Sequence, residues 1–250
     1  MGDISRGTIN KEGYPVLIGE ILFPPELPKV VVPFIEAANN ALSDRNFILA
    51  LDNLNNGANA WKKTTVEYDS VAELFFEYSK GNIYLTAGKL EHALQAFYNC
   101  RKFADTSRLP FTNPDRSLPF YGIGEVFYEM EEYELSARSF LKAREIRESV
   151  LGLEHVQTAS TFNNLACCFF MLSRSQEALG YIEIAEVVLD SELGSHHERT
   201  MTSRNNLKKI SRGTFDNKPA FRKFWEVFEE DQFEKKKKKK KDDGGKKGKK

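Results

Sequence analysis

The sequence predicts an all-α protein, a right-handed α-solenoid of stacked antiparallel helix pairs with a C-terminal capping helix. The first observation is a repeat: segments 152–165 and 194–207 share Gly, Thr, Asn, Asn and Leu in register, 42 positions apart. The second is that small and aromatic residues recur at helical spacing inside the copies, as in Ala93 and Phe97. A fixed period of this length indicates stacked units and not one closed core.

Three further copies extend the repeat toward the N-terminus, so that five segments repeat at a spacing of 42 to 43 residues. The copy that starts at residue 152 continues through Ala166 to Phe169 with Ala178 and Ala185. The three further copies are centred on Gly124 to Phe127 with Phe140 and Ala143, on Gly81 to Tyr84 with Ala93 and Phe97, and on a weaker set of Ala38, Ala41, Phe47 and Ala50.

Residues 1–29 are expected to form an extended N-terminal arm. Four glycines and four prolines exclude a long helix there, whereas the apolar run 16–23 needs cover, so the arm should lie on the solenoid. The repeat domain is expected over 30–211. Its helices are predicted at 30–44, 46–62, 67–87, 89–105, 117–130, 132–149, 155–172, 174–191 and 197–211, with a proline-rich loop and an Asn113-Pro-Asp turn before the fifth.

Residues 212–234 are expected to form an aromatic amphipathic helix. Four aromatic side chains recur at i, i+3, i+4 and i+7 and therefore share one helix face: Phe221, Phe224, Trp225 and Phe228. Two interpretations stay open at this point. The helix caps the last repeat, as a solenoid requires, or it presents aromatic anchors to a partner.

Residues 235–250 are predicted to be a disordered tail that binds polyanions. They contain 11 lysines and two aspartates, so the remaining chain carries about nine net negative charges although the whole chain is neutral. Such a composition cannot bury apolar surface. The polyanion-binding residues are expected to be Lys235, Lys236, Lys237, Lys238, Lys239, Lys240 and Lys241.

The pattern Gly81-x-x-Tyr84 followed by Ala93-Leu-Gln-Ala-Phe97 resembles the tetratricopeptide repeat, whose usual period is about 34 residues. The longer unit, with its Gly-x-x-His-x-x-Thr start and Asn-Asn-Leu-Ala, resembles the kinesin-light-chain branch of that family. The resemblance covers about residues 30–211. The closing proline is absent from most units, and Ser136 replaces the usual alanine.

The resemblance implies that the first helix of each unit lines a concave groove for peptides. By register, the partner-binding residues are expected to be Asn39, Tyr78, Asn82, Tyr121, Glu125, Asn163, Asn164 and Asn205, within a wider set that adds Ile35, Phe75, Tyr128, Ser160, Cys167, Thr202 and Asn206. Asparagine can bond a peptide backbone as donor and acceptor, and tyrosine adds area with a polar tip. Alternatively, several of the aromatic residues fill the core between helices.

Catalytic motifs are not found, so the chain is predicted not to be an enzyme and to need no cofactor or metal. There is no P-loop, His196-His197 lacks the spacing of a zinc site, and adjacent Cys167 and Cys168 cannot both face one metal from a helix. The cysteine pattern predicts a reducing compartment, and no apolar run reaches membrane-spanning length. We expect a cytoplasmic chain, with the nucleus as the alternative.

These features predict a non-enzymatic adaptor that binds protein segments in its groove. Short tetratricopeptide proteins with Lys/Gly-rich ends are similar to structural components of cilia and other microtubule assemblies, so the lysine tail is expected on the acidic tails of tubulin, with the axoneme as a location. The alternative is a nuclear or RNA-associated factor whose lysine run is a localisation or nucleic-acid-binding signal.

Overall fold

The computed structural model describes residues 15–19, 27–64, 70–106 and 109–213. The chain divides into two units, 1–213 and 214–250, and every described residue belongs to the first. The predicted aromatic helix and lysine tail therefore lie outside the described residues.

The described residues contain nine α-helices and one 3₁₀ helix, and no strand is found among them. The all-α prediction is confirmed, and every helix begins and ends within three residues of its predicted limits. The helices are α1 (Val32–Ser43), α2 (Phe47–Lys62), α3 (Ser70–Thr86), α4 (Leu90–Thr106), η1 (Pro114–Ser117), α5 (Leu118–Glu129), α6 (Tyr133–Leu151), α7 (Val156–Met171), α8 (Ser175–Leu193) and α9 (Glu198–Gly213).

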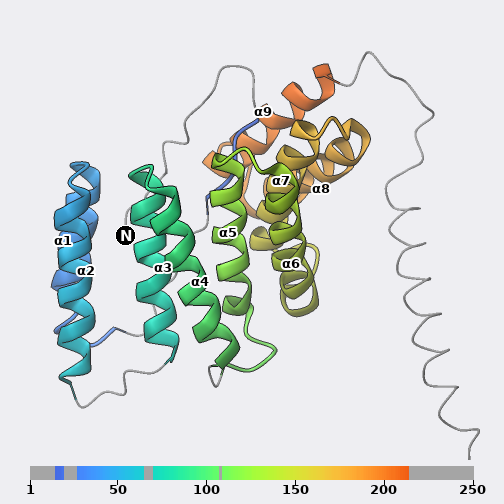
Figure 1. Ribbon diagram of the computed structural model, residues 1–250. Coiled ribbons are helices and arrows are strands. Elements are labelled where there is room, and N and C mark those ends of the chain that lie inside the picture. Colours follow the sequence, from blue (N-terminus) through green and yellow to red (C-terminus); the bar gives the residue numbers. More distant parts are fainter. Residues whose placement is uncertain (1–14, 20–26, 65–69, 107–108, 214–250) are drawn as a thin grey trace, which may run out of the picture. The chain divides into compact units, whose positions relative to one another are not determined.

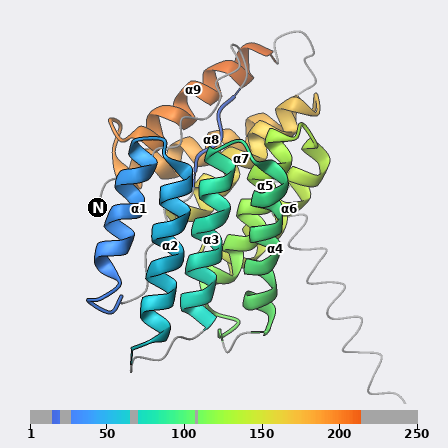
Figure 2. The same cartoon turned by 60° about the vertical axis from the view of Figure 1, so that its left-hand side comes forward.

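Neighbouring helices pack as pairs, which stack in chain order (Figures 1 and 2). The pairs are α1 with α2, α3 with α4, α5 with α6, and α7 with α8, while α9 packs on α8 and α7. First helices of successive pairs also touch, α3 with α5 and α7 with α9. The stacked architecture predicted from the repeat is confirmed.

The turn inside each pair contains one residue with a left-handed backbone. Arg45, Gly88, Glu131 and Ser173 have φ values of 57°, 71°, 64° and 59°, and they follow one another at the repeat spacing. Left-handed backbone costs about 1–2 kcal/mol for a residue with a Cβ, and glycine avoids that cost. The same turn is therefore built four times, three times without glycine.

The start of α7 and the start of α9 explain the repeated Gly-x-x-His-x-x-Thr motif. Gly152 and Gly194 end the preceding helices with φ values of 87° and 84°. Three residues later, Nδ1 of His155 accepts a hydrogen bond from the Gln157 N–H (3.1 Å), and Nδ1 of His197 does the same for Arg199 (3.2 Å). These histidines are helix caps, which satisfy N–H groups that have no partner in the first turn.

Glycines in the helices permit close approach of aromatic rings. A Cβ at Gly81 or at Gly122 would lie 2.5 Å from the ring of Phe97, and a Cβ at Gly124 would lie 2.9 Å from the ring of Phe140. Ala93, together with Ala178 and Ala185, is fully buried. The two glycines of the Gly122-Ile-Gly124 run therefore serve close helix packing.

Candidate functional site

Residues 15–19, which we call the arm segment, lie on the face formed by α5, α7 and α9. Their backbone contacts side chains from all three helices, up to 190 positions away in the sequence. Most of the contacts fall on Val16 and Ile18, two residues apart, as expected for extended backbone with a period of two, and the Pro15 and Gly19 carbonyls accept one hydrogen bond each. The arm segment therefore occupies this face as an extended peptide would.

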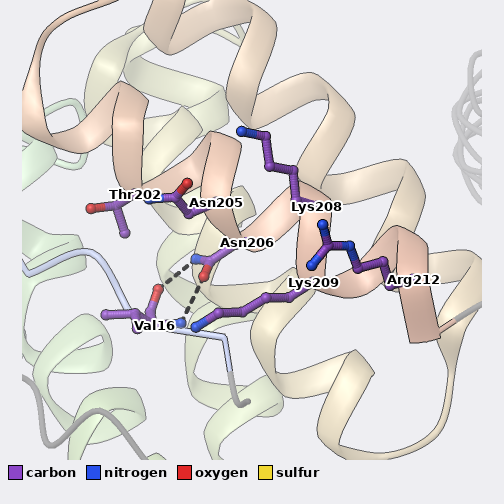
Figure 3. A pocket seen from close by; sticks show the side chains of 7 residues that line it. All are labelled: Val16, Thr202, Asn205, Asn206, Lys208, Lys209 and Arg212. Atoms are coloured by element: carbon purple, nitrogen blue, oxygen red, sulfur yellow. Dashed lines mark hydrogen bonds between the residues drawn. The ribbon is translucent and has the colours of Figure 1, made fainter. Parts of the chain in front are cut away.

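Two asparagines in equivalent repeat positions each bond both backbone groups of one arm residue. Oδ1 of Asn164 accepts from the Ile18 N–H (2.8 Å), and its Nδ2 donates to the Ile18 carbonyl (3.1 Å). Asn206 pairs with Val16 in the same way, at 2.8 Å and 2.6 Å (Figure 3). A carboxamide supplies one acceptor and two donor hydrogens, so it can pair with both the N–H and the carbonyl of one residue.

Further hydrogen bonds link these asparagines to their neighbours. Nδ2 of Asn164 donates to the Tyr121 hydroxyl (2.8 Å), and that hydroxyl donates to the Ile18 carbonyl. Nδ2 of Asn206 donates to Oδ1 of Asn163 (2.9 Å). Asn164 and Asn163 are fully buried, and Asn206 is 1% exposed. Because buried polar groups must be paired, this network requires the arm backbone or another peptide in its place.

The side chain of Ile18 completes an apolar cluster between α7 and α8. It packs with Ala159 and Leu189 and with partly buried side chains around them, and only 4% of its surface is exposed. Burying an aliphatic side chain of this size stabilises by about 1.5–3 kcal/mol. The site thus contacts both the arm backbone and the Ile18 side chain, and Leu17 is also buried, with 6% of its surface exposed.

Two arginines lie near the C-terminal end of the arm segment. Arg199, which is 8% exposed, donates to the Gly19 carbonyl (3.0 Å) and to the Ser160 hydroxyl (3.2 Å). Arg147 is fully buried; it donates to Ser117 and Thr161, and its guanidinium lies 4.4 Å from the ring centroid of Tyr121. Arg147 therefore packs against the ring of Tyr121, while Arg199 contacts the arm segment directly.

One tyrosine hydroxyl and two cysteine thiols in or next to this face are buried, and burial favours their uncharged forms. Burial raises the pKa of the Tyr128 hydroxyl, which donates to the Pro15 carbonyl (3.2 Å). Burial also raises the pKa of Cys167 well above its ordinary value and that of Cys168 to about 12. The Cys167 thiol donates to the Val16 carbonyl (3.6 Å). These thiols are packing and hydrogen-bonding groups, not nucleophiles at neutral pH.

The residues predicted to bind partners fall into three groups. Tyr121, Asn163 and Asn164 contact the arm segment. Tyr78 is fully buried, with its ring centroid 5.2 Å from that of Phe97. The remaining four stand in other surroundings: Glu125 is buried, Asn39 and Asn82 are half-buried in α1 and α3, and Asn205 is exposed on α9. Their predicted role in partner binding stays a prediction.

Some arm contacts come from residues outside the shorter predicted set. Asn206 belongs only to the wider set, although its register with Asn164 marks it as an equivalent position. Arg199 was not predicted at all. It follows the helix cap of α9, and no local pattern distinguishes an arginine that reaches the arm from one that faces solvent.

Comparison with known proteins finds one repeat family that matches part of the chain. Residues 116–185, from η1 into α8, match the tetratricopeptide repeat. No curated protein matches the sequence of the chain. The match confirms the resemblance inferred from the repeat motif.

Solved structures share the fold at low sequence identity. A variant of a kinesin-light-chain protein from Podosopora anserina with nearly identical TPR-like repeats is 15% identical, with a TM-score of 0.60 over 84% of this chain and 96% of that one. BtubC (BKLC) from P. vanneervenii is 13% identical, with a TM-score of 0.60 over 77% of this chain and 84% of that one. Both likenesses concern the fold alone.

Proposed function

We propose that this chain of tetratricopeptide repeats is a non-enzymatic scaffold that holds an extended protein segment on the face of α5, α7 and α9. The observation that carries the proposal is the pairing of Asn164 and Asn206 with both backbone groups of alternate arm residues. The fold supports a protein-interaction scaffold, and this network binds peptide backbone whatever side chains it carries.

The arm segment indicates the chemistry of a suitable partner. A partner segment must be extended, must place an aliphatic side chain where Ile18 lies, and must leave a carbonyl for Arg199 where Gly19 lies. Such a segment competes with the arm, which is tethered to the same chain. A short tether gives an effective concentration near the millimolar range, so a partner must bind tightly or be locally abundant.

For the cellular setting we propose a microtubule-based assembly in the cytoplasm, such as a cilium or its axoneme. The support is the run Lys235–Lys241 in a tail with 11 lysines, which suits the acidic tails of tubulin. Flexible ammonium groups act as point charges and attract any dense anion. None of the described helices is both long and apolar enough to cross a membrane.

Peptide binding in trans tests the scaffold function. Ile18→Asp places a carboxylate in the apolar cluster and should expel the arm from its site. A fluorescent peptide of residues 14–20 should then bind the full-length variant at least about tenfold more tightly than it binds the unaltered chain, because the tethered competitor is gone. Val16→Asp is the matched control: its side chain is half-exposed, so the arm should stay and binding should not rise.

The Asn164→Ala change, added to Ile18→Asp, should abolish the gained binding, with circular dichroism used to verify that both variants are folded. A folded Ile18→Asp variant that gains no affinity for the peptide contradicts the proposal. So does a gain that persists in full without the Asn164 side chain.

A further inference from the structure

A separate pocket opens on α9 beside the arm segment (Figure 3). Its volume is about 380 Å³, and it is lined by seven residues, of which the last three are cationic: Val16, Thr202, Asn205, Asn206, Lys208, Lys209 and Arg212. Most of the exposed lining is apolar, as expected for Val16 and the aliphatic stems of the lysines and the arginine. Only Val16 and Asn206 are shared with the arm network. The pocket therefore remains while the arm segment is in place.

The charge of α9 is opposite to that of the rest of the body. Residues 1–234 contain 25 basic and 34 acidic side chains, whereas α9 contains five basic residues and one acidic residue. Arg204 pairs with Glu186 (2.7 Å) and with Asp190 (3.1 Å), and Arg199 bonds the arm. The other three line the pocket, so positive charge is concentrated there on an acidic protein.

The position of these three cations in the repeat shows what they replace. Lys208, Lys209 and Arg212 correspond to Ala166, Cys167 and Phe170 of α7, where the first two are fully buried. Among the described residues no helix follows α9. A terminal repeat needs a polar outer face, and cations suit the end of a helix. Neither requirement calls for a pocket lined by charges of a single sign.

Asn205 adds a second kind of recognition to the pocket. It corresponds to Asn163, whose Nδ2 donates to the Val16 carbonyl (3.3 Å). Asn205 is exposed and lines the pocket, and its side chain makes no hydrogen bond to a described residue. The repeat thus presents a peptide-binding amide next to Lys208 and Arg212, which form no ion pair within the described part of the chain.

We infer that this pocket binds an extended, carboxylate-rich segment of a partner protein, at a site distinct from the arm site. The cations neutralise the carboxylates, while the Asn205 amide and the Thr202 hydroxyl bond the backbone. A nucleic acid fits less well, because the lining offers no aromatic ring on which a base could stack. The site goes beyond the proposed function, since it needs no displacement of the arm segment.

A labelled ten-residue oligoglutamate tests the inference on the full-length chain in buffered physiological salt. The triple variant Lys208→Gln, Lys209→Gln, Arg212→Gln should bind the probe about tenfold more weakly than the unaltered chain, as expected for three partly exposed charge pairs. The matched control neutralises three exposed lysines elsewhere: Lys29→Gln, Lys63→Gln and Lys89→Gln. It should lose less than about twofold. Because the lysine tail also attracts the probe, binding is measured from the backbone amide NMR signals of α9, which report occupancy of the pocket and not of the tail.

Two further variants separate the pocket from general charge effects. Lys208→Gln with Arg212→Gln leaves the half-buried Lys209 in place, and it should still weaken binding severalfold if the triple variant folds poorly. Asn205→Ala should weaken oligoglutamate binding but leave unchanged the affinity for oligodeoxythymidine, which measures charge alone. Equal losses in the pocket and control triples overturn the inference. So does tighter binding of oligodeoxythymidine than of oligoglutamate that is lost in the pocket triple.

Discussion

The side-chain amide of Asn164 pairs with both backbone groups of Ile18, 146 positions earlier in the chain. The pair is fully enclosed, because Asn164 is inaccessible to solvent and Ile18 is 4% exposed. A buried amide without partners costs about 1–3 kcal/mol, so the peptide on this face and the asparagine stabilise each other. The arm segment is therefore part of the folded structure. Its hydrogen bonds to Asn164 also indicate which kind of ligand this face accepts.

The helix crossing at Ala178 should not tolerate a large side chain. Ala178 is fully buried in the first turn of α8. Ala178→Phe should therefore lower the free energy of unfolding by about 1–3 kcal/mol through overpacking. Urea denaturation followed by circular dichroism measures this. If the variant is as stable as the unaltered chain, a large side chain fits at this crossing and the predicted close packing at Ala178 is wrong.

The left-handed turn residues predict a pair of opposite effects. A Cβ at Gly88 would meet no atom within 4 Å, so Gly88→Ala should cost about 1 kcal/mol from backbone conformation alone. Ser173 is exposed and has φ 59°, so Ser173→Gly should stabilise by about 0.5–1 kcal/mol. Thermal melts of both variants provide the measurement, and a change of the same sign in both would argue against backbone strain.

The Cys168 thiol should make stability fall at high pH. Burial raises its folded pKa to about 12, whereas an unfolded thiol ionises near 8.5. Between these values the unfolded state holds fewer protons, so the free energy of unfolding decreases as pH rises, by up to about 1.4 kcal/mol per pH unit. Urea unfolding between pH 8 and pH 10 should show a steeper decline for the unaltered chain than for Cys168→Ala. Parallel declines would mean that the thiol ionises equally in both states.

The helices could be predicted from the sequence because each repeat restates the same packing and capping requirements. Asn164 could be predicted for the same reason. The arm contacts could not, because a pairing between residues 18 and 164 leaves no periodic signal. Tyr121 illustrates the limit. Its ring packs on Phe140 at a centroid distance of 5.2 Å, as the ring of Tyr78 packs on Phe97 at 5.2 Å in the equivalent place 43 positions earlier. That packing follows from the repeat, whereas the hydrogen bond from Tyr121 to the Ile18 carbonyl depends on where the arm lies, which repeat register does not encode.

The lysine tail should bind microtubules through charge alone. Residues 235–250 contain 11 lysines, and lysine ammonium groups act as point charges, so binding should weaken steeply as salt shortens the screening length from about 8 Å. Deleting residues 235–250 should remove most co-sedimentation with microtubules, and so should cleavage of the acidic tubulin tails. Unchanged sedimentation after cleavage, together with strong competition by nucleic acid, would favour the nuclear alternative.

Amide hydrogen exchange at Val16 and Ile18 tests most directly whether the asparagines hold an extended segment on this face. Both N–H groups should exchange at least about a hundredfold more slowly than in an unstructured peptide, because exchange requires local opening of the site. Asn206→Ala should speed exchange mainly at Val16, and Asn164→Ala mainly at Ile18, while the amides of α3 and α4 stay protected in both variants. Exchange of Val16 and Ile18 at the unstructured rate in the unaltered chain would contradict the account.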